Sequence, residues 1–197
     1  MRPASLIELL RERIGDVHPE LDVLEVASED LLGARTSSGA AYDRKRIYRY
    51  ILWRTWDADL PTLVVIMLNP STAGHEGDDR TIGTLLARCM HFGYGSLLVL
   101  NLFALRATEP SEMKSSEDPI GPANDSILDM LLELRPERIL CAWGAHGSHQ
   151  NRSEDMRCRI SRSGTIPQAI RLTKAGEPEH PLYKSPSLPH EEWRIAG

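Results

Sequence analysis

The stretch Thr62-Leu63-Val64-Val65-Ile66-Met67-Leu68-Asn69-Pro70-Ser71-Thr72 joins a continuous apolar run to a polar turn. Because the run does not alternate with polar residues, it predicts a strand that is buried on both faces of a sheet. Pro70 lacks the N–H that a sheet ladder needs and disfavours helix at the preceding residue, so the chain is expected to turn at Asn69. Ligands of open α/β sheets bind just beyond the carboxyl ends of such strands, which makes Asn69 a candidate site residue. The alternative is an Asx turn in which Asn69 bonds only its own backbone.

Two further apolar runs lie downstream of this strand. Residues 96–101 predict a second buried strand that again ends in asparagine, and residues 138–144 predict a third that ends in a small-residue turn. Between these strands, apolar residues recur at helical spacing over 82–89 and again over 124–134, which predicts two helices. This alternation of strands and helices is typical of right-handed β-α-β crossovers in a parallel sheet.

The aromatic and β-branched segment 47–53 predicts another strand upstream of the central one. Only the short turn 57–61 separates the two, so we expect them to form an antiparallel pair. The sheet is then mixed at one edge. The predicted fold is a three-layer α/β/α sandwich with a mainly parallel central sheet.

The chain divides by pattern into an N-terminal extension, residues 1–40, and a single α/β domain, residues 41–197. The extension is predicted to hold a short amphipathic helix over 5–14 and a candidate strand over 21–26. Residues 37–41, which are small and polar, are expected to form a loop.

The overall charge and the cysteine content limit the class of protein. A formal net charge of -5 and a pI near 5.8 argue against nonspecific coating of nucleic acid. Three widely spaced cysteines without a C-x-x-C pair favour a reducing cytosol over a disulfide framework. The sequence lacks a signal-peptide pattern and any apolar run near the roughly 20 residues that span a bilayer. We therefore predict a soluble, cytoplasmic protein without a membrane partner.

Sequence motifs of several enzyme classes are absent. No phosphate-binding G-x-x-x-x-G-K-[ST], dinucleotide-binding G-x-G-x-x-G, nucleophile-elbow G-x-S-x-G or zinc-binding H-E-x-x-H occurs, so no cofactor is predicted. A metal-dependent hydrolase built on Asp78 and Asp79 is an alternative, with histidines 75, 146 and 149 as further candidate ligands. Their spacing is not diagnostic, and acidic pairs in loops are usually helix caps or solvated charges. No metal site is therefore predicted.

Polar residues follow the predicted strands at the points where these strands end. They are Asn69 with Pro70 and Ser71, Asn101, Trp143 with Gly144, and, from a late loop, His180 and Tyr183. A carboxamide presents an acceptor and two donors in one plane, which matches the edge of a nucleobase. A histidine can donate a hydrogen bond to a departing base. The alternative is that Asn101 caps the next turn and His180 is a surface loop residue.

A basic segment follows the third strand and is the candidate contact for phosphate. Residues 146–174 hold six Arg or Lys against two acids, including Arg152 and Arg157. Such a run of basic residues more often forms a charged face that is exposed to solvent. Arg106 and Lys184 are further candidates for phosphate binding, and for Arg106 an ion pair with Asp79 is the alternative.

Seven motifs together resemble a bacterial and phage family defined only as a domain of unknown function. The resemblance covers about residues 40–186 and implies no activity. The motifs are Tyr48-Arg49-Tyr50, Leu68-Asn69-Pro70-Ser71-Thr72-Ala73, Asp78-Asp79-Arg80-Thr81-Ile82, Asn101-Leu102-Phe103-Ala104-Leu105-Arg106-Ala107-Thr108-Glu109-Pro110, Asp118-Pro119-Ile120-Gly121-Pro122-Ala123-Asn124-Asp125, Ala142-Trp143-Gly144 and His180-Pro181-Leu182-Tyr183.

The order of four of these motifs also resembles the uracil-DNA glycosylase superfamily. Leu68-Asn69-Pro70-Ser71 is similar to its catalytic loop, and Leu98-Val99-Leu100-Asn101 to the strand whose asparagine reads the base. Ala142-Trp143-Gly144 is similar to its Leu-Trp-Gly strand end, and His180-Pro181-Leu182 to its His-Pro-Ser loop, whose histidine stabilises the leaving base.

The resemblance implies roles for three residues in cleaving an N-glycosidic bond. Asn69 would orient the attacking water, Asn101 would read the base edge and His180 would stabilise the leaving group. Asn69 stands where the most active branch has aspartate, and Leu182 replaces a phosphate-binding serine. The predicted function is recognition or hydrolysis of a (modified) base in DNA or a nucleotide, and a non-catalytic nucleobase-binding module is the main alternative. Protein partners cannot be inferred from the sequence.

Overall fold

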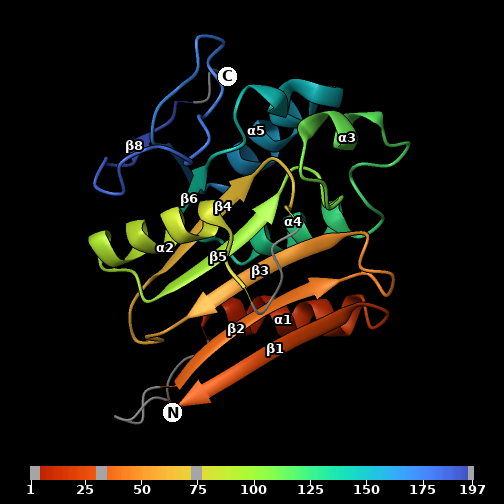
Figure 1. The fold of residues 1–197 in the computed structure, drawn as a ribbon, viewed down its shortest axis with the longest axis vertical. Helices are drawn as coiled ribbons and strands as arrows, with labels where there is room; N and C mark the ends of the chain where they lie inside the picture. The colour runs from red at the N-terminus through yellow and green to blue at the C-terminus, as the bar shows by residue number, and fades with distance from the viewer. Residues whose placement is uncertain (1–4, 30–34, 72–76, 195–197) are drawn as a thin grey trace.

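A computed structural model of the chain describes residues 5–29, 35–71 and 77–194 (Figure 1). Within them a single eight-stranded sheet carries helices on both faces. In sheet order the strands are β1 (Asp22–Glu29), β2 (Arg35–Tyr42), β3 (Arg49–Thr55), β5 (Ser96–Asn101), β4 (Thr62–Met67), β6 (Arg138–Cys141), β7 (Ile166–Ala169) and β8 (Glu191–Glu192). The helices are α1 (Leu6–Val17), α2 (Arg80–Phe92), α3 (Pro110–Ser115), α4 (Asn124–Glu133) and α5 (Arg152–Ser163), with a 3₁₀ segment η1 (Ala145–Asn151).

The sheet is mixed, and the expectation of a mainly parallel sheet is corrected. The strands β5, β4, β6 and β7 form three parallel pairs, whereas the four remaining pairings are antiparallel. The antiparallel pairings come from β1, β2 and β3 at one edge and β8 at the other. The alternating pattern of strands and helices predicted the parallel block, but the flanking strands carry no comparable signal of their direction.

The strand β3 pairs antiparallel with β2 and β5 and not with β4, which corrects the predicted pairing. The turn between β3 and β4 passes around the start of β5 and leaves room for that strand. The N–H groups of Trp56 and Asp57 both donate to the carbonyl of Gly95, and the Gly95 N–H donates to Pro61. A Cβ at Gly95 would lie 1.9 Å from the Asp57 carbonyl oxygen, so only glycine permits this close approach.

The N-terminal forty residues take part in the same sheet. The predicted helix is α1 and the candidate strand is β1, which pairs with β2 from Asp22 opposite Tyr42 to Glu29 opposite Arg35. Residues 37–41, predicted as a loop, lie inside β2, and so does the boundary predicted after residue 40. Small side chains are required here because Ala40 and Ala41 are fully buried in the two cores.

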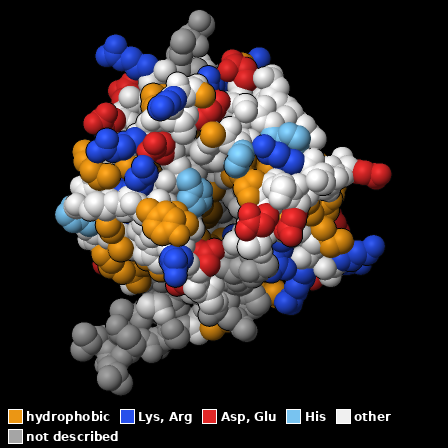
Figure 2. Space-filling model, turned by 45° about the horizontal axis from the view of Figure 1, so that its top comes forward, with side chains coloured by type: hydrophobic (Ala, Val, Ile, Leu, Met, Phe, Trp, Pro, Cys, Tyr) orange, Lys and Arg blue, Asp and Glu red, His pale blue; other side chains and the backbone are white. Residues whose placement is uncertain are grey.

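The central strand β4 is buried on both faces, as predicted. Val64 and Leu98 belong to the core that α1, α4 and α5 cover, whereas the alternate residues Val65 and Val99 belong to the core under α2. The carboxyl ends of β4, β5 and β6 meet at one edge of the sheet, since these strands are parallel. Figure 2 turns the molecule so that the top of Figure 1 comes forward, and its surface is hollowed near the centre.

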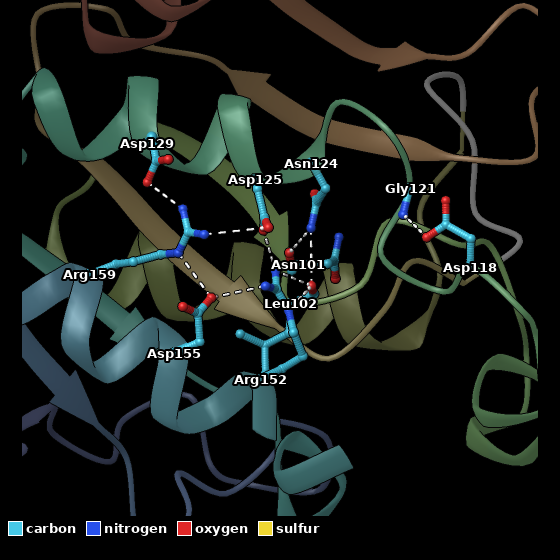
Figure 3. Close-up of polar contacts among 10 residues, drawn as sticks. All are labelled: Asn101, Leu102, Asp118, Gly121, Asn124, Asp125, Asp129, Arg152, Asp155 and Arg159. Atoms are coloured by element: carbon cyan, nitrogen blue, oxygen red, sulfur yellow. Dashed lines mark hydrogen bonds and ion pairs between the residues drawn. The ribbon is translucent and has the colours of Figure 1, made fainter. Parts of the chain in front are cut away.

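A buried arginine fixes the chain where β5 ends (Figure 3). The Arg152 Nε and one of its terminal nitrogens donate to the Leu102 carbonyl at 3.2 and 3.0 Å. The Asn124 amide donates to the carbonyls of Asn101 and Leu102 at 3.1 and 3.0 Å. Arg152 also pairs with Asp125 of α4 and Asp155 of α5 at 2.6 and 3.0 Å. These contacts tie the end of β5 to both helices.

The C-terminal segment is held against α2 by a second buried arginine. Arg88, which is fully buried, donates hydrogen bonds to the carbonyls of Ser185 and Leu188. The His190 ring lies 5.1 Å from the Phe92 ring and 6.5 Å from the Tyr94 ring. Burial, with a smaller effect of Arg88, lowers the pKa of His190 to about 4. Among the helices of the described residues, none has both the length and the apolar character to cross a membrane.

Replacing Arg152 by methionine is expected to lower the free energy of unfolding by about 3 kcal/mol, because the buried Leu102 carbonyl loses two of its donors and Asp125 and Asp155 each lose an ion-pair partner. Urea denaturation monitored by circular dichroism measures the change. The matched control is Arg138→Met, since the Arg138 side chain is 55% exposed and, among the residues that the structure describes, forms an ion pair with the neighbouring Glu137 alone. We expect that control to change stability by less than about 0.5 kcal/mol. Equal losses in the two variants would contradict the role given to Arg152.

The low pKa of His190 predicts a dependence of stability on pH. An unfolded histidine titrates near 6.5, so between pH 6.5 and about 4 the unfolded state binds a proton that the folded state does not. Stability should therefore fall as the pH decreases through this window, by about 1–2 kcal/mol from this residue after screening by solvent. Denaturation at several pH values should give a flatter profile for His190→Gln than for the wild type. Identical profiles would refute this assignment.

Candidate functional site

A cavity of about 400 Å³ lies beyond the carboxyl ends of β4, β5 and β6. It is smaller than the 690 Å³ hollow at the opposite edge of the sheet, but it is lined by the predicted strand-end residues Asn69, Ser71, Asn101, Trp143 and Gly144 and by His180. Its polar lining comes from strand ends, from the loop before α2 and from the C-terminal segment. The polar and glycine residues among them are Arg49, Asn69, Ser71, Asp79, Thr81, Asn101, Thr108, Gly144, His146 and His180.

Asn69 is oriented by the backbone around it. Its side-chain nitrogen donates to the carbonyl of Ala107 at 2.8 Å and to that of Pro70 at 3.1 Å. The bond to Pro70 is the local bond expected if Asn69 only binds neighbouring backbone. The bond to Ala107, however, joins Asn69 to a different segment of the chain. Because both bonds engage the nitrogen, the carbonyl oxygen Oδ1 is the part of the amide that can accept a hydrogen bond from a ligand or water. Pro70 is buried and does not line the cavity; its carbonyl accepts the hydrogen bond from Asn69.

Asn101 occupies the last position of β5 and is 2% exposed. Its backbone carbonyl is bound by Asn124, as described above. Within the described residues its side-chain amide makes no hydrogen bond, although it lines the cavity. A buried carboxamide without a protein partner carries a desolvation cost that a ligand with matching polar groups would remove.

His180 enters the cavity from the C-terminal segment in a defined protonation state. The Leu182 N–H donates to Nδ1 at 3.3 Å, so Nδ1 is an acceptor and the ring proton of the neutral form sits on Nε2. Burial lowers the pKa of His180, and the charge of Asp79 opposes that effect in part. At neutral pH the residue therefore offers Nε2–H as a hydrogen-bond donor.

Trp143 and Gly144 follow β6 and form the wall on that side of the cavity, and a buried carboxylate helps to position them. The Trp143 indole donates to Glu177 at 2.7 Å, and the Ser153 hydroxyl donates to the other carboxylate oxygen at 2.9 Å. Gly144 has φ 71°, a left-handed conformation that favours glycine, and its N–H donates to Pro178 at 2.7 Å. The Trp143 side chain is thus bound within the fold, and glycine is favoured at position 144 by its left-handed backbone conformation and not by lack of space, since a Cβ there would lie 3.8 Å from the His180 Cβ.

Two charged residues of the cavity were not predicted to contact a nucleobase or phosphate: Arg49 had no assigned role, and Asp79 was considered only as a metal ligand or an ion-pair partner of Arg106. Arg49, at the start of β3, is 3% exposed, and burial lowers its pKa to about 10, so it remains protonated at neutral pH. Asp79 caps α2 through the Ile82 N–H at 2.8 Å and accepts a hydrogen bond from Ser71 at 2.5 Å. Both belong to motifs of the predicted family, but neither position carries a signal that distinguishes ligand contact from structure.

The residues predicted to bind phosphate lie outside the cavity. All three side-chain nitrogens of Arg152 are engaged, and Arg157 contacts Glu154 and Glu177 and stacks on Trp193 at 4.6 Å. Arg106 donates to the Arg46 carbonyl at 3.0 Å and lies 5.6 Å from the Tyr42 ring.

Lys184 pairs with Glu179 at 2.5 Å, and Tyr183, predicted to contact ligand, is 82% exposed and does not line the cavity. Three of the six basic residues of the segment 146–174 are thus used in ion pairs within the protein. Arg159 of the same segment, for example, pairs with Asp129 and Asp155.

The acids proposed as metal ligands have other partners. Asp78 pairs with Arg54 at 2.8 Å and Asp79 caps α2. His146 contacts the Lys114 ammonium at 3.1 Å, and the His149 ring lies 5.7 Å from the Phe103 ring. His75 lies outside the described residues, and within those residues no three His, Cys, Asp or Glu side chains form a group that could hold a metal ion.

Comparison with known proteins gives one match. A family model described as "Protein of unknown function (DUF1643)" matches residues 49–182, which is more than half of the chain. Neither the curated proteins nor the solved structures gave a match. The predicted resemblance to a domain of unknown function is confirmed, whereas the resemblance to uracil-DNA glycosylases stays a prediction.

The geometry of His180 predicts its behaviour in nuclear magnetic resonance. Nitrogen chemical shifts of the imidazole should report the Nε2–H tautomer at pH 7, because Nδ1 accepts from Leu182. The ring should titrate below pH 6.5, since burial disfavours the charged form. Comparison with His180→Gln assigns the resonance. An Nδ1–H tautomer, or titration above pH 6.5, would show that the side chain is not arranged as described.

Proposed function

Because the chain belongs to the DUF1643 family, whose description states no activity, we propose a function from the cavity itself: hydrolysis of the N-glycosidic bond between a nucleobase and its sugar. One observation carries the proposal. Asn69, Asn101 and His180 come from three distant segments of the chain and line the same cavity. Their side chains offer the acceptor, the planar amide and the donor that this chemistry uses.

Each residue has a role that follows from its hydrogen bonds. The unpaired amide of Asn101 would bind the edge of the base, and Nε2–H of His180 would donate to the base as negative charge develops on it. The Oδ1 atom of Asn69 would accept a hydrogen bond from the attacking water, because its nitrogen is held by Ala107 and Pro70.

The reaction balances without a cofactor. The water oxygen forms a bond to the anomeric carbon while the carbon–nitrogen bond breaks. The electron pair of that bond leaves with the base, which His180 stabilises, and a proton from water ends on the released base. Asn69 orients water but is not a proton acceptor, so this assignment predicts a modest rate. Bases that leave easily are the expected substrates.

The arrangement of the core supports a further part of the proposal. We propose that β5, β4, β6 and β7, with their covering helices, form a uracil-DNA glycosylase-like core. The supporting observation is that residues of the three strand-end motifs and of the histidine loop, which follow one another along the chain in the order that the resemblance implies, line one cavity. The antiparallel strands would then be additions at both edges.

A non-catalytic binding module is the second candidate, and the side chain at position 69 favours it. An amide stands where a carboxylate would assist the attack of water most strongly. The same Asn101 and His180 contacts would serve a protein that binds a nucleobase without cleaving it. The two candidates differ in turnover and not in affinity.

Base release is the decisive measurement. We expect the wild-type protein to release free base from at least one member of a panel of nucleotides and DNA oligomers with uracil, hypoxanthine or hydroxymethylated pyrimidines. Asn69→Ala and His180→Ala should each lower the rate by about 100-fold or more, with ligand affinity largely kept. His91→Ala, at an exposed histidine of α2, is the matched control and should retain full activity.

The other outcomes separate the candidates. Release that chelator abolishes would replace this mechanism with a metal-dependent one. Binding of nucleotides without release of base by folded protein would overturn hydrolysis and leave the binding module.

A further inference from the structure

We propose that Asp79, the N-cap of α2, accepts the proton of the attacking water in this cavity. This inference rests on the proposed function, because it supplies a group that the proposed hydrolysis lacks. Asn69 orients water through Oδ1, but an amide is not a proton acceptor. Three features of the structure carry the inference: the chemistry of the other polar groups in the cavity, the contacts that orient Asp79 and the charges near it.

The other polar side chains of the cavity are poorly suited to take up a proton. Of the described residues that line it, Asp79 alone has an acidic side chain. Nδ1 of His180 accepts from the Leu182 N–H, and Nδ1 of His146 accepts from the Lys114 ammonium at 3.1 Å. Each neutral ring therefore carries its proton on Nε2 and has no ring nitrogen left to take another from water. The remaining groups are hydroxyls, amides and a guanidinium, which are poor bases.

Two hydrogen bonds hold the Asp79 carboxylate beside the loop that carries Asn69. Oδ1 accepts from the Ile82 N–H at 2.8 Å, and Oδ2 accepts from the Ser71 hydroxyl at 2.5 Å. Ser71 is two residues after Asn69, so the second bond ties the carboxylate to the loop that orients water. A carboxylate has about four lone-pair sites, and these bonds use one on each oxygen. Within the described residues, each oxygen thus keeps a lone pair that water in the cavity can use.

The charges near Asp79 suit a step that moves negative charge across the cavity. Its charge acts on both Arg49 and His180, so the carboxylate lies near these two side chains. The N-terminus of α2 also favours a negative charge at this position. When the carboxylate takes a proton, the negative charge passes to the departing base, to which His180 donates. The net charge of the cavity stays the same, so no new charge has to be created away from solvent.

The step balances without a further reactant. The water oxygen forms a bond to the anomeric carbon while one of its O–H bonds breaks, and that proton passes to Asp79. The carbon–nitrogen bond breaks, and its electron pair leaves with the base. Asp79 then gives its proton to the released base through solvent, which restores the carboxylate.

Substitutions that keep the helix cap separate proton transfer from structure. Asparagine and serine are both good N-cap residues, so circular dichroism should show that Asp79→Asn and Asp79→Ser are folded. The substrate is the uracil, hypoxanthine or hydroxymethylated pyrimidine that the wild-type protein releases. We expect each variant to lower the single-turnover rate of base release by about 100-fold or more, with affinity for the substrate changed little.

The matched control is Asp78→Asn, which removes the same charge from the preceding residue. Asp78 is exposed, pairs with Arg54 and does not line the cavity. This variant should keep the rate within about threefold of the wild type, because a partly exposed ion pair contributes little.

Formate gives a readout that a purely structural role of Asp79 would not change. Serine at position 79 leaves space where the carboxylate stood, so sodium formate should raise the rate of Asp79→Ser by about tenfold or more. Sodium formate should not restore Asn69→Ala, and sodium chloride at the same ionic strength should restore neither variant. In the wild-type protein the single-turnover rate should be lower in heavy water than in ordinary water, because a proton moves in the step. Equal rates in the two solvents would overturn the inference even if no variant folded.

The inference and the proposed function fail in different ways. Full activity of Asp79→Asn, an equal loss in Asp78→Asn, or no effect of formate on Asp79→Ser would overturn the inference. Release of base that still requires Asn69 would then retain the proposed hydrolysis. No release from any member of the panel by folded wild-type protein would overturn both.

Discussion

The carbonyl groups at the end of β5 impose the constraint on which the candidate site depends. The strand ends inside the protein, so the carbonyls of Asn101 and Leu102 need hydrogen-bond donors that no neighbouring strand supplies. Asn124 and Arg152 supply them from α4 and α5, and Arg152 is itself neutralised by Asp125 and Asp155. The same contacts join two helices to the sheet and hold Asn101 at the cavity with its side-chain amide left for a ligand.

Buried charged side chains also satisfy polar groups in other segments around the cavity. Arg88 satisfies two carbonyls of the C-terminal segment and so fixes the segment that carries His180. Glu177 binds the Trp143 indole and Ser153 and fixes the wall that carries Gly144. Buried polar groups thus mainly hold in place the segments that surround the cavity. Arg49 differs from them because it is both buried and part of the cavity lining.

The sequence indicated the candidate site through the residues at its strand ends. Continuous apolar runs predicted the buried strands, and polar residues directly after them predicted Asn69, Asn101 and Gly144, because the carboxyl ends of parallel strands share one edge. It could not find Arg49, which stands at the start of an antiparallel strand whose position in the sheet was unknown. It also assigned Arg152 and Arg157 to phosphate, since a run of arginines looks the same whether its charges face solvent or acids of another helix.

By itself the sequence determined the central strands, the helices α1, α2 and α4, and the parallel direction of the central block, because hydrophobic periodicity and crossover handedness are local properties. The tertiary structure alone decided that β5 lies between β3 and β4, that residues 37–41 form part of a strand, and which charges are paired. Ion pairs and strand neighbours join residues far apart in the chain, and many partners are compatible with one pattern of residue types. The choice among them is made only when the elements pack, since burial then requires each charge and carbonyl to have a partner.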